Sequence, residues 1–178
     1  MAYTLRNILL ASATFITAVS LSSCVTESDG PTTEYVRTGD RLPLFTATMN
    51  DGTTIDTDSL RGQQSMIVFF NTDCADCRRE LPIVEEYSQK YHLQTRIICI
   101  SRSQSQSEIE RYWKEHSLTL PFSAQNDSKI FNMFATSGIP RIYISDPDLT
   151  VTDVFTDRNM ASLSDLELAT GVLSLIHI

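Results

Sequence analysis

Met66-Ile67-Val68-Phe69-Phe70 form a continuous apolar run of strand length. Successive side chains of a strand point to opposite sides, so such a run is apolar on both faces and must be covered on both. Ile97 to Ile100 and Ile142 to Ile144 are two further runs of this kind, and Val151 to Thr156 is a weaker candidate. The sequence therefore predicts a central sheet with both of its faces buried.

Between these runs the apolar period changes to that of a helix. Apolar side chains recur there at spacings of three and four, so they share one helix face. Two segments show the pattern: Leu81, Val84, Tyr87 and Tyr91, and then Ile109, Tyr112, Trp113 and His116. Capping boxes at Ser105 with Glu108 and at Ser164 with Glu167 predict where the second and the last helix begin.

The order β-α-β-α-β-β-α predicts an α/β fold, with helices on both faces of a central mixed sheet. An N-terminal hairpin precedes it, because Asn50-Asp51-Gly52 separates the short extended segments Leu44 to Met49 and Thr53 to Asp56. With 178 residues and 42% hydrophobic residues, the chain is expected to form one folded domain. The net charge of −8 argues against nucleic acid as a partner.

Residues 1–23 have the features of a secretory signal: one base, Arg6, then a short apolar stretch from Ile8 to Leu21, then small residues. The ending Leu21-Ser22-Ser23-Cys24 resembles the signal of bacterial lipoproteins. That resemblance implies that Cys24 is lipidated and becomes the first residue of the mature chain. An ordinary cleaved signal that happens to include a cysteine is the alternative.

Residues 24–38 are polar and are predicted to be a tether, and residues 39–178 are predicted to be the folded domain. Removal of residues 1–23 deletes one base and no acid, which makes the domain slightly more acidic. Such a domain is repelled by anionic headgroups, so the lipid on Cys24 would hold it at the membrane. We expect an exported lipoprotein that faces the periplasm or lies in the cell envelope.

Cys74-Ala75-Asp76-Cys77 follows a predicted buried strand and precedes a predicted helix. Unpaired N–H groups and the helix dipole at such a place stabilise a thiolate at the first cysteine. The second sulfur lies about one turn further on, close enough to form a disulfide. The spacing therefore favours redox chemistry.

Three other readings of the pair are weaker. A zinc site needs two more ligands, and the chain has no second C-x-x-C, while His92, His116 and His177 are scattered. A structural disulfide across so short a loop removes little chain entropy. Two neighbouring thiols left unused in the core are unexpected in an exported protein, where they would oxidise. We expect no metal and no cofactor beyond the cysteine pair itself.

The segment from Phe69 to Pro82, with Cys74-Ala75-Asp76-Cys77 inside it, resembles the active-site segment of the TlpA and ResA group of bacterial thiol-disulfide oxidoreductases. The resemblance extends over roughly Gly39 to Leu173 and includes Ser137-Gly138-Ile139-Pro140. It implies a thioredoxin-like fold in which Pro140 is a cis-proline that faces the cysteine pair, with Ile139 and Pro140 in contact with the substrate.

The same resemblance implies that Cys74 and Cys77 are the catalytic pair and that Glu80 handles protons near it. An exposed carboxylate beside Arg78 and Arg79 is the other interpretation of Glu80. Cys99 lies in the apolar run that ends at Ile100 and is expected to be a buried small hydrophobe.

The sequence departs from the family pattern at three places. Asp73 stands where Trp is usual, Asp76 where Pro is frequent, and Arg141 where Thr is common. Two carboxylates beside Cys74 raise its pKa while the helix end lowers it, so we expect a pKa nearer the roughly 7 of a thioredoxin than the roughly 3.5 of a strong oxidant. Asp73 is alternatively the N-cap of the helix.

The leading functional prediction is a reductase of disulfides in exported proteins, such as apocytochromes, which is itself re-reduced by an upstream thiol donor. A peroxiredoxin-like peroxidase is a second hypothesis. Peroxiredoxins place a Thr three residues before the reactive cysteine, where this chain has Asn71, and Thr72 comes one residue too late. A redox-inactive binding module is the third hypothesis, and the retention of both cysteines argues against it.

Overall fold

The computed structural model describes residues 32–172 of the chain. The predicted signal, Cys24 and the first part of the predicted tether lie outside these residues, as do residues 173–178. Twelve elements follow one another along the described chain: β1 (Thr46–Thr48), β2 (Thr54–Asp56), η1 (Thr57–Leu60), β3 (Gln64–Phe70), α1 (Ala75–Tyr91), β4 (Thr95–Ser101), α2 (Gln106–His116), β5 (Phe122–Ser123), η2 (Phe131–Met133), β6 (Arg141–Ser145), β7 (Val151–Thr156) and α3 (Leu163–Ala169).

The central sheet has the strand order β5-β4-β3-β6-β7, and β3, the apolar run from which the prediction started, lies in its middle. It pairs in parallel with β4 and antiparallel with β6, so the sheet is mixed. The hairpin of β1 and β2 forms a separate small sheet. The predicted fold class is therefore confirmed. The sequence did not predict β5, because two residues are too few to show a period.

The side chains of β3 alternate between the two faces of the sheet, and one face carries Gln64 and Phe70. Thr95 of β4 lies opposite Gln64 and shares this face. Three contacts join this face of the sheet to the helices. The ring of Phe70 packs on Trp113 of α2, with ring centroids 5.0 Å apart. Gln64 Nε2 donates to the carbonyl of Thr170 after α3 at 3.4 Å, and Thr95 Oγ1 lies 2.8 Å from the hydroxyl of Tyr87 in α1. All three α-helices thus lie on one face.

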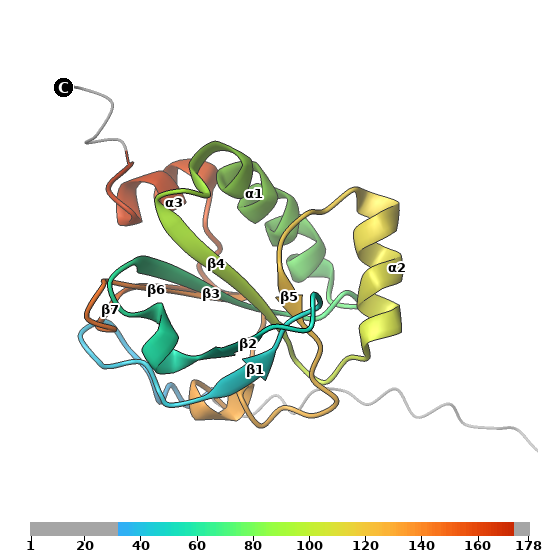
Figure 1. The fold of residues 1–178 in the computed structure, drawn as a ribbon, viewed down its shortest axis with the longest axis horizontal. Coiled ribbons are helices and arrows are strands. Elements are labelled where there is room, and N and C mark those ends of the chain that lie inside the picture. The colour runs from blue at the N-terminus through green and yellow to red at the C-terminus, as the bar shows by residue number, and fades with distance from the viewer. Residues whose placement is uncertain (1–31, 173–178) are drawn as a thin grey trace, which may run out of the picture.

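The opposite face carries Phe69, whose ring packs against Phe131, Phe134 and Tyr143 with centroids 4.8 to 6.1 Å apart. Phe45, just before the hairpin, packs on Phe134 as well. Figure 1 shows α1 and α3 above the sheet and the hairpin below it, with η2 in orange. This face is covered by the hairpin and the short 3₁₀ helix η2, so the predicted helices on both faces are represented here by η2 alone and by none of the three α-helices.

The distribution of the helices follows from the strand order. The chain moves from β3 to β4 and then to β5 in the same direction across the sheet, and all three strands are parallel. Crossovers between parallel strands are almost always right-handed. Two right-handed crossovers in the same direction place α1 and α2 on the same face, which the period of the sequence could not reveal.

The helix starts confirm one predicted capping box and correct the other. Ser105 and Glu108 form the box at the start of α2, as expected. At α3 the box consists of Ser162 and Asp165, so the prediction of Ser164 with Glu167 is wrong. Asp165 can fill the third position of a box as a glutamate does, and the sequence offers both pairs two residues apart.

Residues 32–38, which the sequence assigns to the tether, contact the domain. The N–H groups of Tyr35 and Val36 donate to the carbonyl of Phe134 at 2.9 and 3.2 Å, and the side chain of Val36 is buried. The folded unit therefore reaches back at least to Thr32. Among residues 32–172, no helix is both long and apolar enough to cross a membrane.

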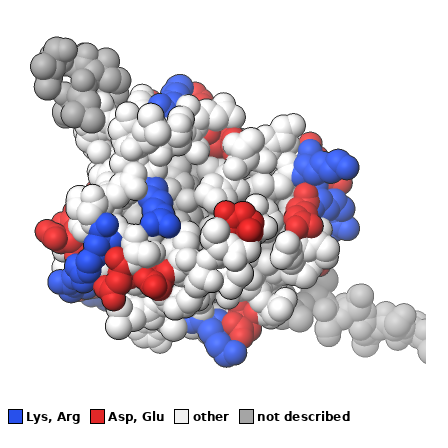
Figure 2. All heavy atoms as spheres, viewed as in Figure 1, with Lys and Arg blue, Asp and Glu red and all other residues white. Residues whose placement is uncertain are grey.

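Acidic and basic side chains are interspersed on the face of the molecule shown in Figure 2. Many of the charges are paired, as Arg61 is with Asp58 at 3.2 Å and Lys90 with Glu86 at 2.9 Å. These pairs are exposed, and pairs of this kind contribute little to stability. The stability of the fold therefore rests on the two apolar layers on either side of the sheet.

Replacement of Phe69 by Ala should destabilise the domain strongly. The ring is fully buried among three aromatic partners, and truncation of such a side chain costs about 3–5 kcal/mol. Urea unfolding followed by fluorescence measures the loss. Leu93→Ala is the control, because Leu93 is 78% exposed and its truncation should leave the midpoint unchanged. A midpoint in Phe69→Ala equal to that of the parent would contradict the assigned core.

Candidate redox site

Cys74 is the residue at which the buried strand passes into α1. Its backbone N–H donates to the carbonyl of Asn71 at 3.1 Å, which closes the turn after β3. Cys74 is itself the N-cap of α1, and its Sγ accepts the N–H of Cys77 at 3.4 Å. The sulfur therefore takes up one of the helix donors that lack a partner within the helix.

Asp73 is not the cap of the helix, which corrects the alternative interpretation of that residue. Its own N–H donates to Asn71 Oδ1 at 2.8 Å. Its carboxylate is exposed and lies 3.8 Å from Arg78 Nη2. Asp76, inside the first turn, pairs with Arg79 at 2.7 Å.

The two thiols differ strongly in acidity. The pKa of Cys74 is lowered from 9.0 to about 6, first by the hydrogen bond from the Cys77 thiol. Partial burial of Cys74 opposes this, and the N–H groups of Cys77 and Asp76 lower the pKa of Cys74 further, whereas the Asp76 charge raises it. The pKa of Cys77 is raised far above its ordinary value, because Cys77 donates to Cys74 and is buried. At neutral pH Cys74 is therefore mostly thiolate, whereas Cys77 is protonated.

A backbone carbonyl faces the reactive sulfur from the other side. The peptide bond between Ile139 and Pro140 is cis, as the resemblance implies. When Cys74 is protonated, its thiol donates to the carbonyl of Ile139, with Sγ 3.4 Å from that oxygen. The structure thus brings Cys74, Cys77 and the predicted substrate residues Ile139 and Pro140 together.

Glu80 is buried in α1, with only 1% of its surface exposed, so the interpretation as an exposed carboxylate is wrong. Its Oε1 accepts the N–H of Ala161 at 3.0 Å, and its Oε2 is buried without a partner. Burial raises the pKa of Glu80 from 4.5 to about 7, although the Ala161 N–H and the charge of Arg79 lower it in part. Glu80 therefore exchanges its proton near neutral pH.

A surface hollow of about 680 Å³ opens beside Cys74 and Ile139. It lies at the carboxyl ends of the parallel strands β3 and β4, where α/β proteins usually bind their ligands. Of its other lining residues, Asn71 and Asp73 belong to the motif segment around Cys74. Sequence reasoning did not identify Arg102, Ser103 and Ser128, because they come from loops after other strands and no local motif connects them.

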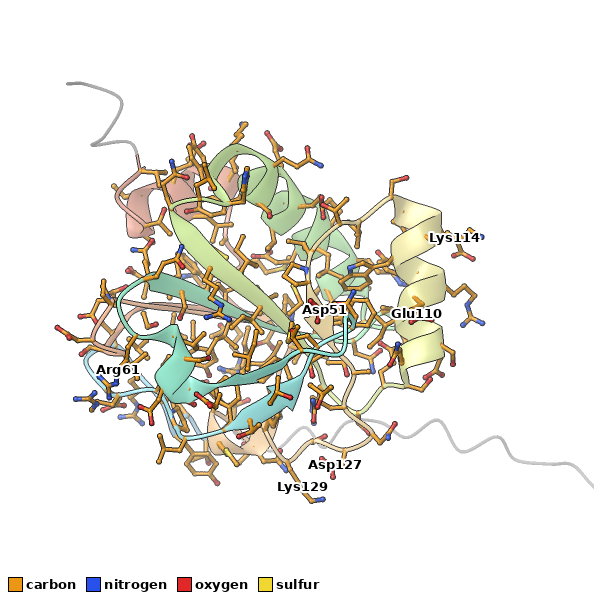
Figure 3. All side chains as sticks on the ribbon, in the orientation of Figure 1. Asp51, Arg61, Glu110, Lys114, Asp127 and Lys129 are labelled. Atoms are coloured by element: carbon orange, nitrogen blue, oxygen red, sulfur yellow. The ribbon has the colours of Figure 1, made fainter. Side chains whose placement is uncertain are left out.

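Two of these loops are held in place by specific contacts. The guanidinium carbon of Arg102 lies 4.7 Å from the centre of the Phe131 ring. Lys129 and Asp127, which flank the lining residue Ser128, form an ion pair at 2.6 Å, and Figure 3 shows their side chains next to each other at the edge of the molecule. The hollow thus has polar walls of both charges.

Thr72 and Gln104 connect the turn before Cys74 to the loop after β4. Gln104 Oε1 accepts the Thr72 N–H at 2.9 Å, and Gln104 Nε2 donates to the Thr72 hydroxyl at 2.6 Å. Both side chains are buried. The Thr72 hydroxyl is therefore bound to Gln104, which fixes the approach of the chain to Cys74.

Cys99 lies in β4 and is fully buried, as predicted, and burial raises its pKa. It is a free thiol, like Cys74 and Cys77. In residues 32–172 there is no group of three or more His, Cys, Asp or Glu side chains that could hold a metal ion.

Residues 38–154 match the model of the AhpC/TSA family. The chain belongs to the AhpC/TSA family. It is also similar to thiol-disulfide oxidoreductase ResA of Bacillus cereus, with 24% identity over 121 residues, which are 67% of this chain and 70% of that protein. ResA of Bacillus subtilis is 21% identical over 131 residues, 73% of each chain. The resemblance found on the motif is therefore confirmed over most of the domain.

Solved structures show the same fold. A thiol:disulfide interchange protein of the thioredoxin family from Chlorobium tepidum aligns with a TM-score of 0.65 and 20% identity, over 77% of this chain and 97% of that chain. StoA from Bacillus subtilis aligns with a TM-score of 0.61 and 16% identity, over 72% and 97%. The AhpC/TSA domain described here thus has the thioredoxin-like fold that was expected.

Removal of the Cys77 thiol should make Cys74 less acidic. Cys77→Ala deletes the main hydrogen bond to the Cys74 thiolate, so the pKa of Cys74 should rise from about 6 to about 7 or above. Iodoacetamide alkylation of Cys74 against pH, followed by mass spectrometry, gives this midpoint. Asp76→Asn should lower the midpoint of Cys74 alkylation, and Asp73→Asn should leave this midpoint unchanged. An unchanged midpoint in Cys77→Ala would exclude the shared hydrogen bond as its cause.

Glu80 should make the protein less stable as the pH rises through 7. Its pKa is about 7 in the folded chain against 4.5 as its ordinary value, so the folded state holds the proton more tightly. This contribution to stability is complete below pH 4.5 and is lost as the pH rises through 7. The free energy of unfolding of Glu80→Gln, relative to that of the parent, should therefore rise by on the order of 3 kcal/mol between pH 4.5 and pH 8.

Urea unfolding of parent and Glu80→Gln at several pH values measures this difference. Glu86→Gln is the control, since Glu86 is exposed beside Lys90. Stability curves of parent and Glu80→Gln that run parallel from pH 4.5 to 8 would show that Glu80 does not titrate near 7.

Proposed function

We propose that this protein is a thiol-disulfide oxidoreductase that reduces disulfides of exported proteins through Cys74 and Cys77. One observation carries the proposal: the accessible sulfur of Cys74 caps α1, has a pKa of about 6 and faces the Ile139 carbonyl, with the protonated Cys77 one turn behind it. A low pKa at an accessible thiol and a second thiol within reach are the requirements of disulfide exchange. The ResA relatives are named thiol-disulfide oxidoreductases, which supports the same activity.

In the first step the Cys74 thiolate attacks one sulfur of a client disulfide. A bond forms between Cys74 Sγ and that sulfur, the client S–S bond breaks, and the second client sulfur leaves as a thiolate that takes a proton from water. The loop of Ile139 and Pro140 lies beside the reacting sulfur, and we assign it the binding of the client backbone.

In the second step Cys77 must lose its proton before it can act. We assign the acceptor role to Glu80, which lies three residues further along α1 and so on the same side of the helix as Cys77. Its pKa of about 7 suits proton transfer at neutral pH. The Cys77 thiolate then attacks Cys74 Sγ, the mixed disulfide breaks, and the client leaves with both sulfurs reduced.

The two electrons that reduce the client come from the cysteine pair, which ends as the disulfide between Cys74 and Cys77. A dithiol donor upstream must return it to the dithiol form before the next cycle. The reaction needs no other cofactor. Apocytochromes, whose haem-binding cysteines must be reduced, are one class of client that would fit.

Export and membrane attachment are part of the proposal and rest on the sequence. The segment that ends in Leu21-Ser22-Ser23-Cys24 has the pattern of a lipoprotein signal. Lipid on Cys24 would hold the domain at the membrane, on the periplasmic side or in the cell envelope, where client disulfides form.

A peroxidase would use the same fold differently, and the position of Thr72 argues against it. The hydroxyl of Thr72 is bound to Gln104, and Asn71 stands at the offset where a peroxiredoxin has Thr. In a peroxidase, Cys74 would be oxidised by peroxide instead of by a client disulfide, so consumption of peroxide distinguishes the two functions.

The purified full-length protein should catalyse the reduction of insulin by dithiothreitol without peroxide. Cys74→Ser should fall to the uncatalysed rate, because the attacking sulfur is gone. Cys77→Ala should accumulate a mixed disulfide with insulin, visible by mass, because resolution is blocked. Glu80→Gln should slow turnover, and Cys99→Ala, which alters only a buried thiol, should retain it.

Three outcomes would contradict this function. Turnover that persists in Cys74→Ser would show that the pair is not the reaction centre. Consumption of hydrogen peroxide with no reduction of insulin would assign the protein to the peroxidases. If the protein neither reduced insulin nor consumed peroxide, it would be a redox-inactive binding module.

A further inference from the structure

Arg141 is buried to 1% exposure at the start of β6, which is rare for an arginine unless its charge is paired. Its partner is Glu34, and the pair is bidentate: Nη1 lies 2.6 Å from Oε2 and Nη2 lies 2.9 Å from Oε1. Arginine and carboxylate in this geometry form a strong, directional contact. The resemblance to the TlpA and ResA group implies no role for Arg141, because Thr is common after the cis-proline in that group.

The remaining donors of Arg141 are directed at the loop that meets the reactive sulfur. Nε donates to the carbonyls of Gly138 at 2.8 Å and of Ser137 at 3.2 Å, and Nη2 donates to the Ser137 carbonyl at 3.0 Å. The next carbonyl along the chain is that of Ile139, which accepts the Cys74 thiol. Arg141 thus fixes the backbone immediately before the contact with Cys74.

A second side chain, that of Asp157, restricts which residue can occupy position 138 of the same loop. The φ of Gly138 is +80°, and Asp157 Oδ1 lies 2.7 Å from the place that a Cβ at this position would occupy. No other residue type fits there without movement of Asp157. The loop therefore lies between Asp157 at Gly138 and the guanidinium of Arg141 at its carbonyls.

Glu34 comes from the segment before the first strand, 107 positions away from Arg141. This segment pairs with the chain that leads into the loop: Glu34 forms a backbone bridge with Ala135, the Thr136 N–H donates to the Thr33 carbonyl at 3.1 Å, and Thr33 donates to the Thr136 hydroxyl at 2.9 Å. The last part of the segment predicted to be a tether is therefore built into the support of the redox loop.

We propose that Arg141, with its charge neutralised by Glu34, is a positioning residue of the redox site, which holds Ser137 to Pro140 where a client chain can bind beside Cys74. This inference rests on the proposed function. Packing alone does not require a guanidinium, since a buried ion pair can be replaced by apolar side chains without loss of stability. The contacts to two successive carbonyls are what an apolar side chain cannot supply.

The test separates client binding from the intrinsic reactivity of Cys74. Glu34→Gln, Arg141→Met and the double variant should lower kcat/KM for insulin about tenfold, mainly through KM, because the loop is misplaced. Alkylation of Cys74 by iodoacetamide should keep its rate within about twofold and its midpoint near pH 6, because this small reagent needs no loop and the helix-end contacts remain. Arg141→Lys should lie between parent and Arg141→Met.

The double variant decides between positioning and a structural role. Glu34→Gln alone leaves the buried guanidinium of Arg141 without its charged partner and is expected to be unstable, whereas Glu34→Gln with Arg141→Met leaves no unpaired buried charge. A purely structural role predicts that the double variant recovers both stability and kcat/KM. The positioning role predicts that it recovers stability and keeps the raised KM.

Asp58→Asn is the matched control, because it breaks an exposed ion pair with Arg61, which lies at the opposite edge of the molecule from α2 in Figure 3. It should change neither kcat/KM for insulin nor the alkylation rate of Cys74. A double variant with the KM of the parent, or alkylation of Cys74 that slows in parallel with insulin reduction, overturns the inference. A parent that does not reduce insulin overturns the proposed function and the inference together, whereas an active parent with equally active variants overturns the inference alone.

Discussion

The hydrogen bond from the Cys77 thiol to Cys74 is the interaction on which the chemistry of this molecule depends. It lowers the pKa of Cys74 and keeps Cys77 protonated, and it exists because Cys74 is the N-cap of α1 and Cys77 lies in its first turn. The start of α1 is in turn fixed by β3, which is buried on both faces and ends at Phe70. A helix that began one residue earlier would direct the backbone N–H of Cys77 to the carbonyl of Asp73 instead of to Cys74 Sγ.

Features that rest on local sequence could be predicted. The buried strands, the cysteine pair at a helix start and the capping box of Ser105 all depend on residues within one element. The fold class followed because the order of strands and helices admits few topologies. The cis bond before Pro140 came from the family resemblance, since local rules make it rare.

Features that rest on contacts between distant segments could not be predicted. Glu34 was assigned to a tether because its neighbours are polar, and its pairing with Arg141 and its bridge to Ala135 show that it belongs to the domain. The placement of α1 and α2 on the same face depends on the direction of the crossovers, which has no signature in the apolar period. The burial of Glu80 depends on Ala161, 81 positions further along the chain.

The position of Cys99 has a consequence for the fidelity of exchange. The domain carries three thiols, and a chain with three thiols can in principle form three different disulfides. Cys99 is shut inside the sheet, and its raised pKa keeps it protonated, so it takes no part in exchange. Oxidation therefore leads to a single product, and a domain that meets many client disulfides is protected from scrambling its own.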